Sequence, residues 1–164
     1  MTQQQAPPPL GPRDPADAWV TGPDGRRFWG RFGAAGLLAI DPARGILLQH
    51  RATWSHFGDT WGLPGGARHE HESAYDAALR EAEEEAGVPA DAVRPLFETV
   101  LDLGFWSYTT VAVTVEHPFE ARIADLESQA LRWVPTADVG SLPLHPGFAA
   151  AWPALHERLS REVP

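Results

Sequence analysis

Three glutamates stand at spacings that would bring them together on one side of a helix. Glu81, Glu84 and Glu85 occupy positions i, i+3 and i+4, and residues at these spacings project together from an α-helix. Like charges so placed destabilise a helix by ~0.2–0.5 kcal/mol per pair. Hard cations such as Mg²⁺ take oxygen ligands and would reverse that repulsion. The cluster is therefore a candidate metal site, and a solvated acidic surface is the alternative for these three residues alone.

The residues on either side of the glutamates predict the helix that would carry them. Ser73 can cap the free amides of a first helical turn, and Gly87 suits the position just past the last turn. Apolar residues at helical spacing predict a buried stripe, which consists of Tyr75, Leu79, Ala82 and Ala86. The segment 61–66, which reads Trp-Gly-Leu-Pro-Gly-Gly, predicts a sharp turn whose glycines let a ligand approach the backbone.

The full spacing around the glutamates resembles the signature of the Nudix hydrolase family, the Nudix box. The matching residues are Gly66, Glu72, Arg80, Glu81, Ala82, Glu84, Glu85, Gly87 and Val88. Ala82 is the one soft match, because a larger aliphatic residue is usual there. The segments 61–66 and 132–135 are also similar to the family, so the resemblance covers most of residues 28–159.

The resemblance implies roles for the charged residues that match the box. The implied metal ligands are Glu81, Glu84, Glu85 and the backbone carbonyl of Gly65, with Mg²⁺ as the cofactor and Mn²⁺ as a substitute. Glu72 and Arg80 would form a charge-assisted pair that orients the loop and the ligands. The general base differs among relatives, and the candidates are Glu81, Glu84, Glu85 and Glu127.

Charged residues outside the glutamate cluster are further candidates. Many members of the family use an acidic residue on the loop before a late strand, where Glu127 lies, and Asp125 and Glu120 are less favoured alternatives. Arg51 and Arg68 are candidates for binding phosphate, because a guanidinium fork matches phosphate oxygens. A surface charge is the alternative for each arginine.

The resemblance implies Mg²⁺-dependent hydrolysis of a phosphoanhydride bond in a nucleoside diphosphate linked to another group. A nucleoside triphosphate, an oxidised nucleotide and an ADP-sugar all remain open, because loops outside the box select the substrate. A non-catalytic nucleotide sensor of the same fold is the alternative function. Five aromatic residues are candidates for stacking on a nucleobase, although such residues more often belong to the core: Trp54, Phe57, Phe105, Trp106 and Tyr108.

The composition limits the classes of partner and chemistry. A net charge of −9 argues against a nucleic-acid polymer as the main partner, because such binding needs a basic surface. The absence of cysteine excludes disulfides and thiolate catalysis, and the absence of lysine excludes Schiff-base chemistry. No stretch approaches the ~18 apolar residues that span a bilayer, so we expect a cytoplasmic protein without a membrane partner. A homodimer is compatible with the resemblance, since dimers are common in the family.

The chain is predicted to form one domain behind a short tail. Residues 1–17 are rich in proline and glutamine and predict a disordered tail, and residues 18–164 predict the Nudix domain. Strands are predicted within 28–40, 45–50, 96–103, 107–116 and 131–134, and a final amphipathic helix within 148–159. The resemblance implies the family fold, an α/β/α sandwich with a mixed central sheet.

Overall fold

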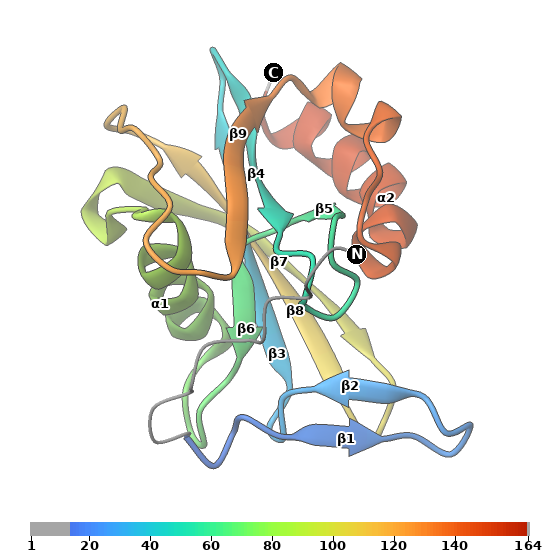
Figure 1. Cartoon of the computed structure of the whole chain (residues 1–164). Helices are drawn as coiled ribbons and strands as arrows, with labels where there is room; N and C mark the ends of the chain where they lie inside the picture. The colour runs from blue at the N-terminus through green and yellow to red at the C-terminus, as the bar shows by residue number, and fades with distance from the viewer. Residues whose placement is uncertain (1–13, 164) are drawn as a thin grey trace, which may run out of the picture.

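A mixed sheet forms the centre of the protein (Figure 1). Among residues 14–163, which the computed structural model describes, this sheet has seven strands. They are β3 (Ala34–Asp41), β4 (Gly45–Arg51), β5 (Trp61–Gly62), β6 (Gly65–Ala67), β7 (Val93–Asp102), β8 (Ser107–Val115) and β9 (Ser128–Val134). The order is β5-β4-β3-β8-β7, with β6 paired to β3 and β9 paired to β4. The predicted strands are therefore present, with bounds shifted by a few residues.

The central strand β3 shows why the sequence folds in this way. All eight of its residues are buried, as expected for a strand that is covered on both faces. It runs parallel to β8 and antiparallel to β4, to which it is joined by a tight turn. Asp41 stabilises this turn, because its carboxylate accepts hydrogen bonds from the amide of Ala43 and from Arg44 Nε, each at 2.8 Å. The strands predicted within 28–40 and 45–50 thus contain β3 and β4, which form an antiparallel hairpin.

Helix α1 (Ala74–Ala86) covers one face of the sheet and α2 (Pro146–Glu162) covers the other, which confirms the predicted sandwich (Figure 1). The ends of α1 are as predicted: Ser73 Oγ accepts a hydrogen bond from Asp76 N at 3.0 Å, and Gly87 adopts φ 66°. The buried face of α1 consists mainly of alanines, namely Ala74, Ala77, Ala78, Ala82 and Ala86. The predicted stripe is therefore correct for Ala82 and Ala86, whereas Tyr75 and Leu79 are only partly buried at its edge. Small side chains let the helix backbone approach β3 closely, which brings the functional side chains near the sheet.

The face of α2 that packs on the sheet is the predicted one, with Phe148, Trp152, Leu155 and Leu159 all buried. Two short 3₁₀ turns, η1 (Ala90–Ala92) and η2 (Thr136–Ser141), connect the main elements. Among residues 14–163, no helix is long and apolar enough to cross a membrane.

A small hairpin of β1 (Trp19–Thr21) and β2 (Arg27–Trp29) precedes the central sheet. It contacts the start of β8, where Trp106 Nε1 donates a hydrogen bond to the carbonyl of Trp29 at 3.1 Å. Most of the predicted tail, residues 1–17, lies outside the described residues. Ala16 is described and fully buried, and its carbonyl accepts hydrogen bonds from the amides of Ala18 and Arg31, so packing against the domain extends at least to Ala16.

Candidate active site

The loop between β6 and α1, which we call the box loop, is held by the ion pair of Glu72 and Arg80. The carboxylate of Glu72 accepts hydrogen bonds from Arg80 Nε at 2.9 Å, from Arg80 Nη2 at 3.0 Å and from His69 N at 2.8 Å. Arg80 Nη2 also donates to the carbonyl of Ala67 at 2.9 Å. The hydrogen bonds from Arg80 hold the pKa of Glu72 below its ordinary range. The pair predicted from the sequence is thus formed, and it ties the loop to the helix.

The three glutamates of the helix do not lie in equivalent surroundings. Glu85 is buried, and its Oε2 accepts a hydrogen bond from Gly65 N at 3.0 Å. Glu81 is largely buried and accepts a hydrogen bond from Arg80 Nη1 at 2.8 Å. Glu84 is 59% exposed and lies 3.7 Å from Arg80 Nη1. Helical spacing alone predicts that the three carboxylates lie together. In the structure, Glu81 and Glu85 lie next to the sheet, whereas Glu84 lies at the surface.

The two glycines of β6 make this approach of helix and strand feasible. The sharp turn predicted for 61–66 is wrong for this pair, because Gly65 and Gly66 lie in the strand without a positive φ and serve by their lack of a side chain. A Cβ atom on Gly66 would lie 2.6 Å from the carboxylate of Glu81, and one on Gly65 would lie 2.4 Å from the carbonyl oxygen of Ala35. Both distances are shorter than real Cβ contacts. The glycine pair therefore leaves the space that the Glu81 carboxylate and the neighbouring strand occupy. The role of the Gly65 carbonyl as a metal ligand stays a prediction.

An acidic cluster forms where the loop before β9 meets the C-terminal end of α1. Carboxylate oxygens of Glu85, Asp125 and Glu127 all lie within 4.8 Å of one another. Backbone hydrogen bonds position the loop, since the amides of Arg122 and Ala124 donate to the last turn of α1 at 3.0 and 3.2 Å. Figure 1 shows this loop running beside α1. We call the three carboxylates the acidic cluster.

The structure separates the acidic residues that the sequence offered as candidates on this loop. Glu127, the favoured one, lies in the acidic cluster, and Asp125, a less favoured one, lies there as well. Glu120 lies elsewhere: its carboxylate is 94% exposed and pairs with Arg44 at 3.5 Å. A sequence signal for Asp125 existed in its spacing of two from Glu127, because Asp125 Oδ1 accepts a hydrogen bond from Glu127 N at 3.0 Å in a local turn.

The electrostatics of this region favour a bound cation. Burial raises the pKa of Glu81 to about 7, and the charges of Glu84 and Glu127 add to the effect. Burial, together with the charges of Glu81, Glu127 and Asp125, raises the pKa of Glu85 well above its ordinary range. Carboxylates that hinder one another's ionisation form an oxygen-only donor set, which is what a hard divalent cation such as Mg²⁺ prefers. The residues therefore fit such an ion.

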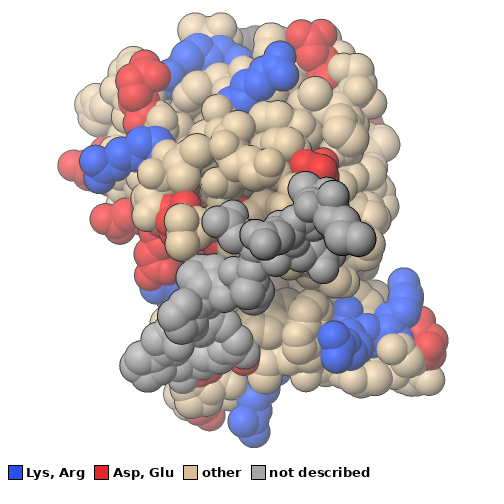
Figure 2. Space-filling model, in the orientation of Figure 1, with Lys and Arg blue, Asp and Glu red and all other residues tan. Residues whose placement is uncertain are grey.

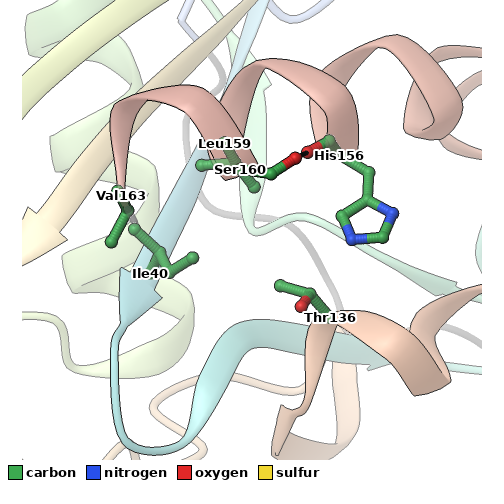
Figure 3. A pocket seen from close by; sticks show the side chains of 6 residues that line it. All are labelled: Ile40, Thr136, His156, Leu159, Ser160 and Val163. Carbon is green, nitrogen blue, oxygen red and sulfur yellow. Dashed lines mark hydrogen bonds between the residues drawn. The ribbon is translucent and has the colours of Figure 1, made fainter.

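Acidic side chains also gather on the surface over α1, as Figure 2 shows in the orientation of Figure 1. A hollow of about 250 Å³ lies in a different place, at the C-terminal end of α2 (Figure 3). Its lining consists of Ile40, Thr136, His156, Leu159, Ser160 and Val163. None of these side chains is a carboxylate or a guanidinium, so this hollow offers no site for a metal–phosphate group.

The two predicted phosphate-binding arginines have different partners. Arg68 donates from Nε and Nη2 to the carbonyl of Glu72, at 3.3 and 2.8 Å, and so supports the box loop. Arg51 ends β4 and donates from Nε to the carbonyl of His56 at 3.1 Å. Tyr108 lies near both Arg51 and the acidic cluster: burial raises its pKa to about 12, with Glu85 adding to the shift and Arg51 opposing it. A phosphate-binding role for either arginine stays a prediction.

The aromatic candidates lie in different parts of the structure, and Trp54 is 40% exposed on the loop between β4 and β5. Trp106 stacks on Phe28 of β2 at 4.7 Å, and Phe105 packs on the same ring at 5.7 Å, so both belong to the contact with the N-terminal hairpin. Phe57, in contrast, is 46% exposed on the loop between β4 and β5, and its ring lies 5.0 Å from the ring of His145. His145 was not among the candidates from the sequence, because it lies before the helix predicted within 148–159 and matches no part of the box.

Comparison with known proteins gives one family. The model of the NUDIX domain matches residues 30–156. The crystal structure of a Nudix hydrolase from M. smegmatis, RenU, is 46% identical, with a TM-score of 0.81 over 90% of this chain and 97% of that one. A Mycobacterium tuberculosis (strain ATCC 25618 / H37Rv) protein named "Putative 8-oxo-dGTP diphosphatase 3" is 46% identical over 153 residues, which are 87% of this chain and 70% of that protein.

A more distant likeness concerns the fold alone. The NUDIX domain of Shewanella oneidensis NrtR, solved in complex with ADP ribose, has a TM-score of 0.61 at 23% identity, over 84% of this chain and 93% of that one.

Proposed function

This chain belongs to the Nudix hydrolase family and is an enzyme that hydrolyses nucleotide phosphoanhydrides, and we propose that it requires Mg²⁺ and acts on oxidised purine nucleoside triphosphates. The observation that carries the metal requirement is the acidic cluster of Glu85, Asp125 and Glu127, whose oxygens lie within 4.8 Å of one another. The substrate class follows from the mycobacterial relative, which is 46% identical and is named for 8-oxo-dGTP. Mn²⁺ is expected to substitute, because it takes the same oxygen ligands.

The proposed metal ligands are the carboxylates that burial and mutual repulsion leave in need of a positive charge. These are Glu81, Glu85 and Asp125. When bound, Mg²⁺ would neutralise phosphate oxygens and lower the pKa of a water that attacks phosphorus. The Glu72–Arg80 pair keeps the helix in register with the box loop, and Arg80 also orients Glu81 through its hydrogen bond of 2.8 Å. Glu84, which lies at the surface, is proposed as a further ligand of the same metal site.

Among the four candidates for the general base, we favour Glu127. A general base must receive a proton in the site and release it to water during each turnover. Glu127 is exposed, yet one of its oxygens lies within 4.8 Å of the oxygens of Glu85 and Asp125. Glu81 and Glu85 lack that access to solvent, and Glu84 lies outside the acidic cluster. Arg51 is proposed to bind a phosphate of the substrate next to the acidic cluster.

A hydrolysis assay with 8-oxo-dGTP, with and without Mg²⁺, tests the proposed function. We expect the wild type to release the monophosphate and pyrophosphate only when the metal is present. The variant Glu85→Gln should lose activity by about 100-fold or more, because it removes a metal ligand. The matched control is Glu83→Gln, an exposed glutamate on the same helix, which should change the rate by less than about twofold.

The outcomes separate the metal requirement from the substrate. Turnover without any divalent cation, or an unimpaired Glu85→Gln enzyme, would refute the proposed metal site. Turnover of an ADP-sugar at a higher kcat/KM than 8-oxo-dGTP would refute the substrate assignment alone. Glu127→Gln should lower kcat while Mg²⁺ still binds in calorimetry, whereas loss of Mg²⁺ binding would make Glu127 a ligand instead of the base.

The sequence left a non-catalytic nucleotide sensor of the same fold as the alternative function. The described residues include every carboxylate of the box, and the relatives reported above at 46% identity are named as a hydrolase and a diphosphatase. We therefore propose no sensor role.

A further inference from the structure

A row of aromatic rings beside Arg51 takes no part in the chemistry described so far. His56 packs against Trp19 at 5.0 Å on one side and against Phe57 at 4.2 Å on the other. Phe57 in turn meets His145 edge to face, with ring centroids 5.0 Å apart and an angle of 82° between the planes. The row is built from β1, the loop between β4 and β5, and the start of α2. Segments far apart in the sequence therefore converge on Phe57.

The backbone at Phe57 is strained. Its φ of 53° lies in the left-handed region, which bulky side chains rarely adopt. Burial does not compensate for this strain, because 46% of the residue is exposed. The loop nevertheless holds the conformation, since Thr60 Oγ1 donates to the carbonyl of Phe57 at 2.6 Å and Gly58 N donates to the carbonyl of Ser55 at 2.9 Å. Backbone strain of this kind is common at functional sites, and at Phe57 it coincides with a ring that packs against two histidines.

His145 presents one defined hydrogen-bond donor beside that ring. It caps α2, and its Nδ1 accepts a hydrogen bond from Gly147 N at 3.1 Å. Because Nδ1 is an acceptor, the proton of the neutral ring is on Nε2. Burial lowers the pKa of His145 to about 4, and the positive charge of Arg51 and the neighbouring His56 act in the same direction. The ring is therefore neutral near pH 7 and has a single N–H to offer.

The strained loop is attached directly to the segment that carries the acidic cluster. The amide of Ala52 donates to the carbonyl of Glu127 at 2.8 Å. Two residues further, Gln129 Nε2 donates to the carbonyl of Arg51 at 2.8 Å and to Asp59 Oδ1 at 3.1 Å. The loop that carries Phe57 and the segment that carries Glu127 are therefore neighbours, with Arg51 between the two in the chain of hydrogen bonds.

We propose that Phe57 and His145 form the nucleobase subsite of this enzyme, with the ring of Phe57 stacking on a purine and Nε2 of His145 donating to an acceptor on the purine edge. Guanine carries such acceptors at O6 and N7, whereas in 8-oxo-guanine N7 carries a proton and the acceptors on these edges are O6 and O8. The inference rests on the proposed function and adds which residues select the base. Both are positioning residues, because neither touches the reacting phosphorus.

The variant Phe57→Asn distinguishes this role from a structural one. Asparagine tolerates the left-handed region, so the change relieves the strain while it removes the stacking ring. We expect KM for 8-oxo-dGTP to rise about tenfold or more with kcat within about twofold, and Tm to stay equal or increase. His71→Asn is the matched control, because His71 has φ 65° and a side chain that is 91% exposed on another loop. It should leave KM unchanged.

His145→Ser tests the donor, since serine keeps an acceptor for the cap but has no ring N–H at that point. KM for 8-oxo-dGTP should rise, with Tm within a few degrees. An abasic deoxyribose triphosphate is the second substrate, and neither variant should change its KM. Equal KM increases for both substrates would show a displaced loop and overturn the proposal, as would an unchanged KM for 8-oxo-dGTP in Phe57→Asn.

Direct binding keeps this test independent of the reaction. Calorimetric titration of the wild type and Phe57→Asn with 8-oxo-dGMP measures the subsite even in an enzyme that does not hydrolyse 8-oxo-dGTP. Absence of turnover with ring-dependent binding would refute the proposed function and retain the subsite. Turnover with equal affinity of both proteins for 8-oxo-dGMP would refute the subsite and retain the function.

Discussion

Replacement of Glu72 by glutamine removes the negative charge that holds the box loop to α1. The hydrogen bonds of Glu72 give the size of the expected loss in the free energy of unfolding. Glu72 accepts two hydrogen bonds from Arg80, at 2.9 and 3.0 Å, and one from His69 N at 2.8 Å. Hydrogen bonds to charged groups contribute ~1.5–3 kcal/mol each. Glutamine retains one acceptor oxygen, so we expect a loss of about 2 kcal/mol in the free energy of unfolding. For a domain of this size the Tm should fall by about 4–8 °C.

Thermal and urea unfolding, followed by circular dichroism, measure this loss. Glu116→Gln is the matched control, because Glu116 also pairs with an arginine, Arg94, at the short distance of 2.7 Å. That pair is exposed, with 59% and 46% of the two side chains accessible, and should contribute less than about 1 kcal/mol. Equal destabilisation by the two variants would refute the reasoning, because it rests on burial and not on distance.

The stability difference between the wild type and Glu72→Gln should also depend on pH. The hydrogen bonds from Arg80 hold the pKa of Glu72 below its ordinary value of 4.5, so the folded state favours the ionised form. The stabilisation is then fully present above pH 4.5 and is lost as the pH falls through the lowered pKa of the folded state. The difference between the wild type and Glu72→Gln should shrink in that range. A difference that stays constant down to complete acid unfolding would contradict the ion pair as its cause.

Two further predictions concern the carboxylates of α1. Mg²⁺ affinity, measured by calorimetry, should fall by about tenfold or more from pH 8 to pH 6, because burial raises the pKa of Glu81 to about 7 and the ion needs the charged form; equal affinities would exclude Glu81 as a ligand. Gly66→Ala should lower kcat/KM by about tenfold or more with little change in Tm, because a Cβ there would lie 2.6 Å from the Glu81 carboxylate, whose flexible end can move. Gly140→Ala, with no atom within 4 Å of its added Cβ, is the control, and an equal effect of both changes would refute the steric argument.

Features that depend on neighbours along the chain were predictable from the sequence. The cap at Ser73 and the left-handed Gly87 follow from local hydrogen bonding and backbone freedom, and both are present. The predicted buried stripe of α1 is correct for Ala82 and Ala86 only. The hairpin of β3 and β4 and the buried face of α2 follow from the same kind of pattern. The family fold itself follows from the resemblance, because the box fixes a loop, a helix and a second loop.

The spacing of residues did not decide which side chains share the site. Glu81 and Glu84 are both on the helix face that the sequence predicts, but Glu81 is largely buried whereas Glu84 is 59% exposed. Asp125 joins Glu85 because backbone hydrogen bonds attach its loop to the end of α1. These arrangements depend on how distant segments dock, and the energies that select them are summed over many weak contacts.

The sequence by itself determined the helix and its carboxylates, because both depend on periodicity and capping within a few residues. It did not determine the conformation of Gly65 and Gly66, which lie in strand β6 because they pair with β3. Only the tertiary structure decided that Arg68 supports the box loop and that Phe57 is held in a left-handed conformation against His145. Phe57 and His145 are separated by about half of the chain, and no local pattern encodes their distance. Packing of the whole sheet between two helices sets that distance, which is why it becomes visible only in the folded protein.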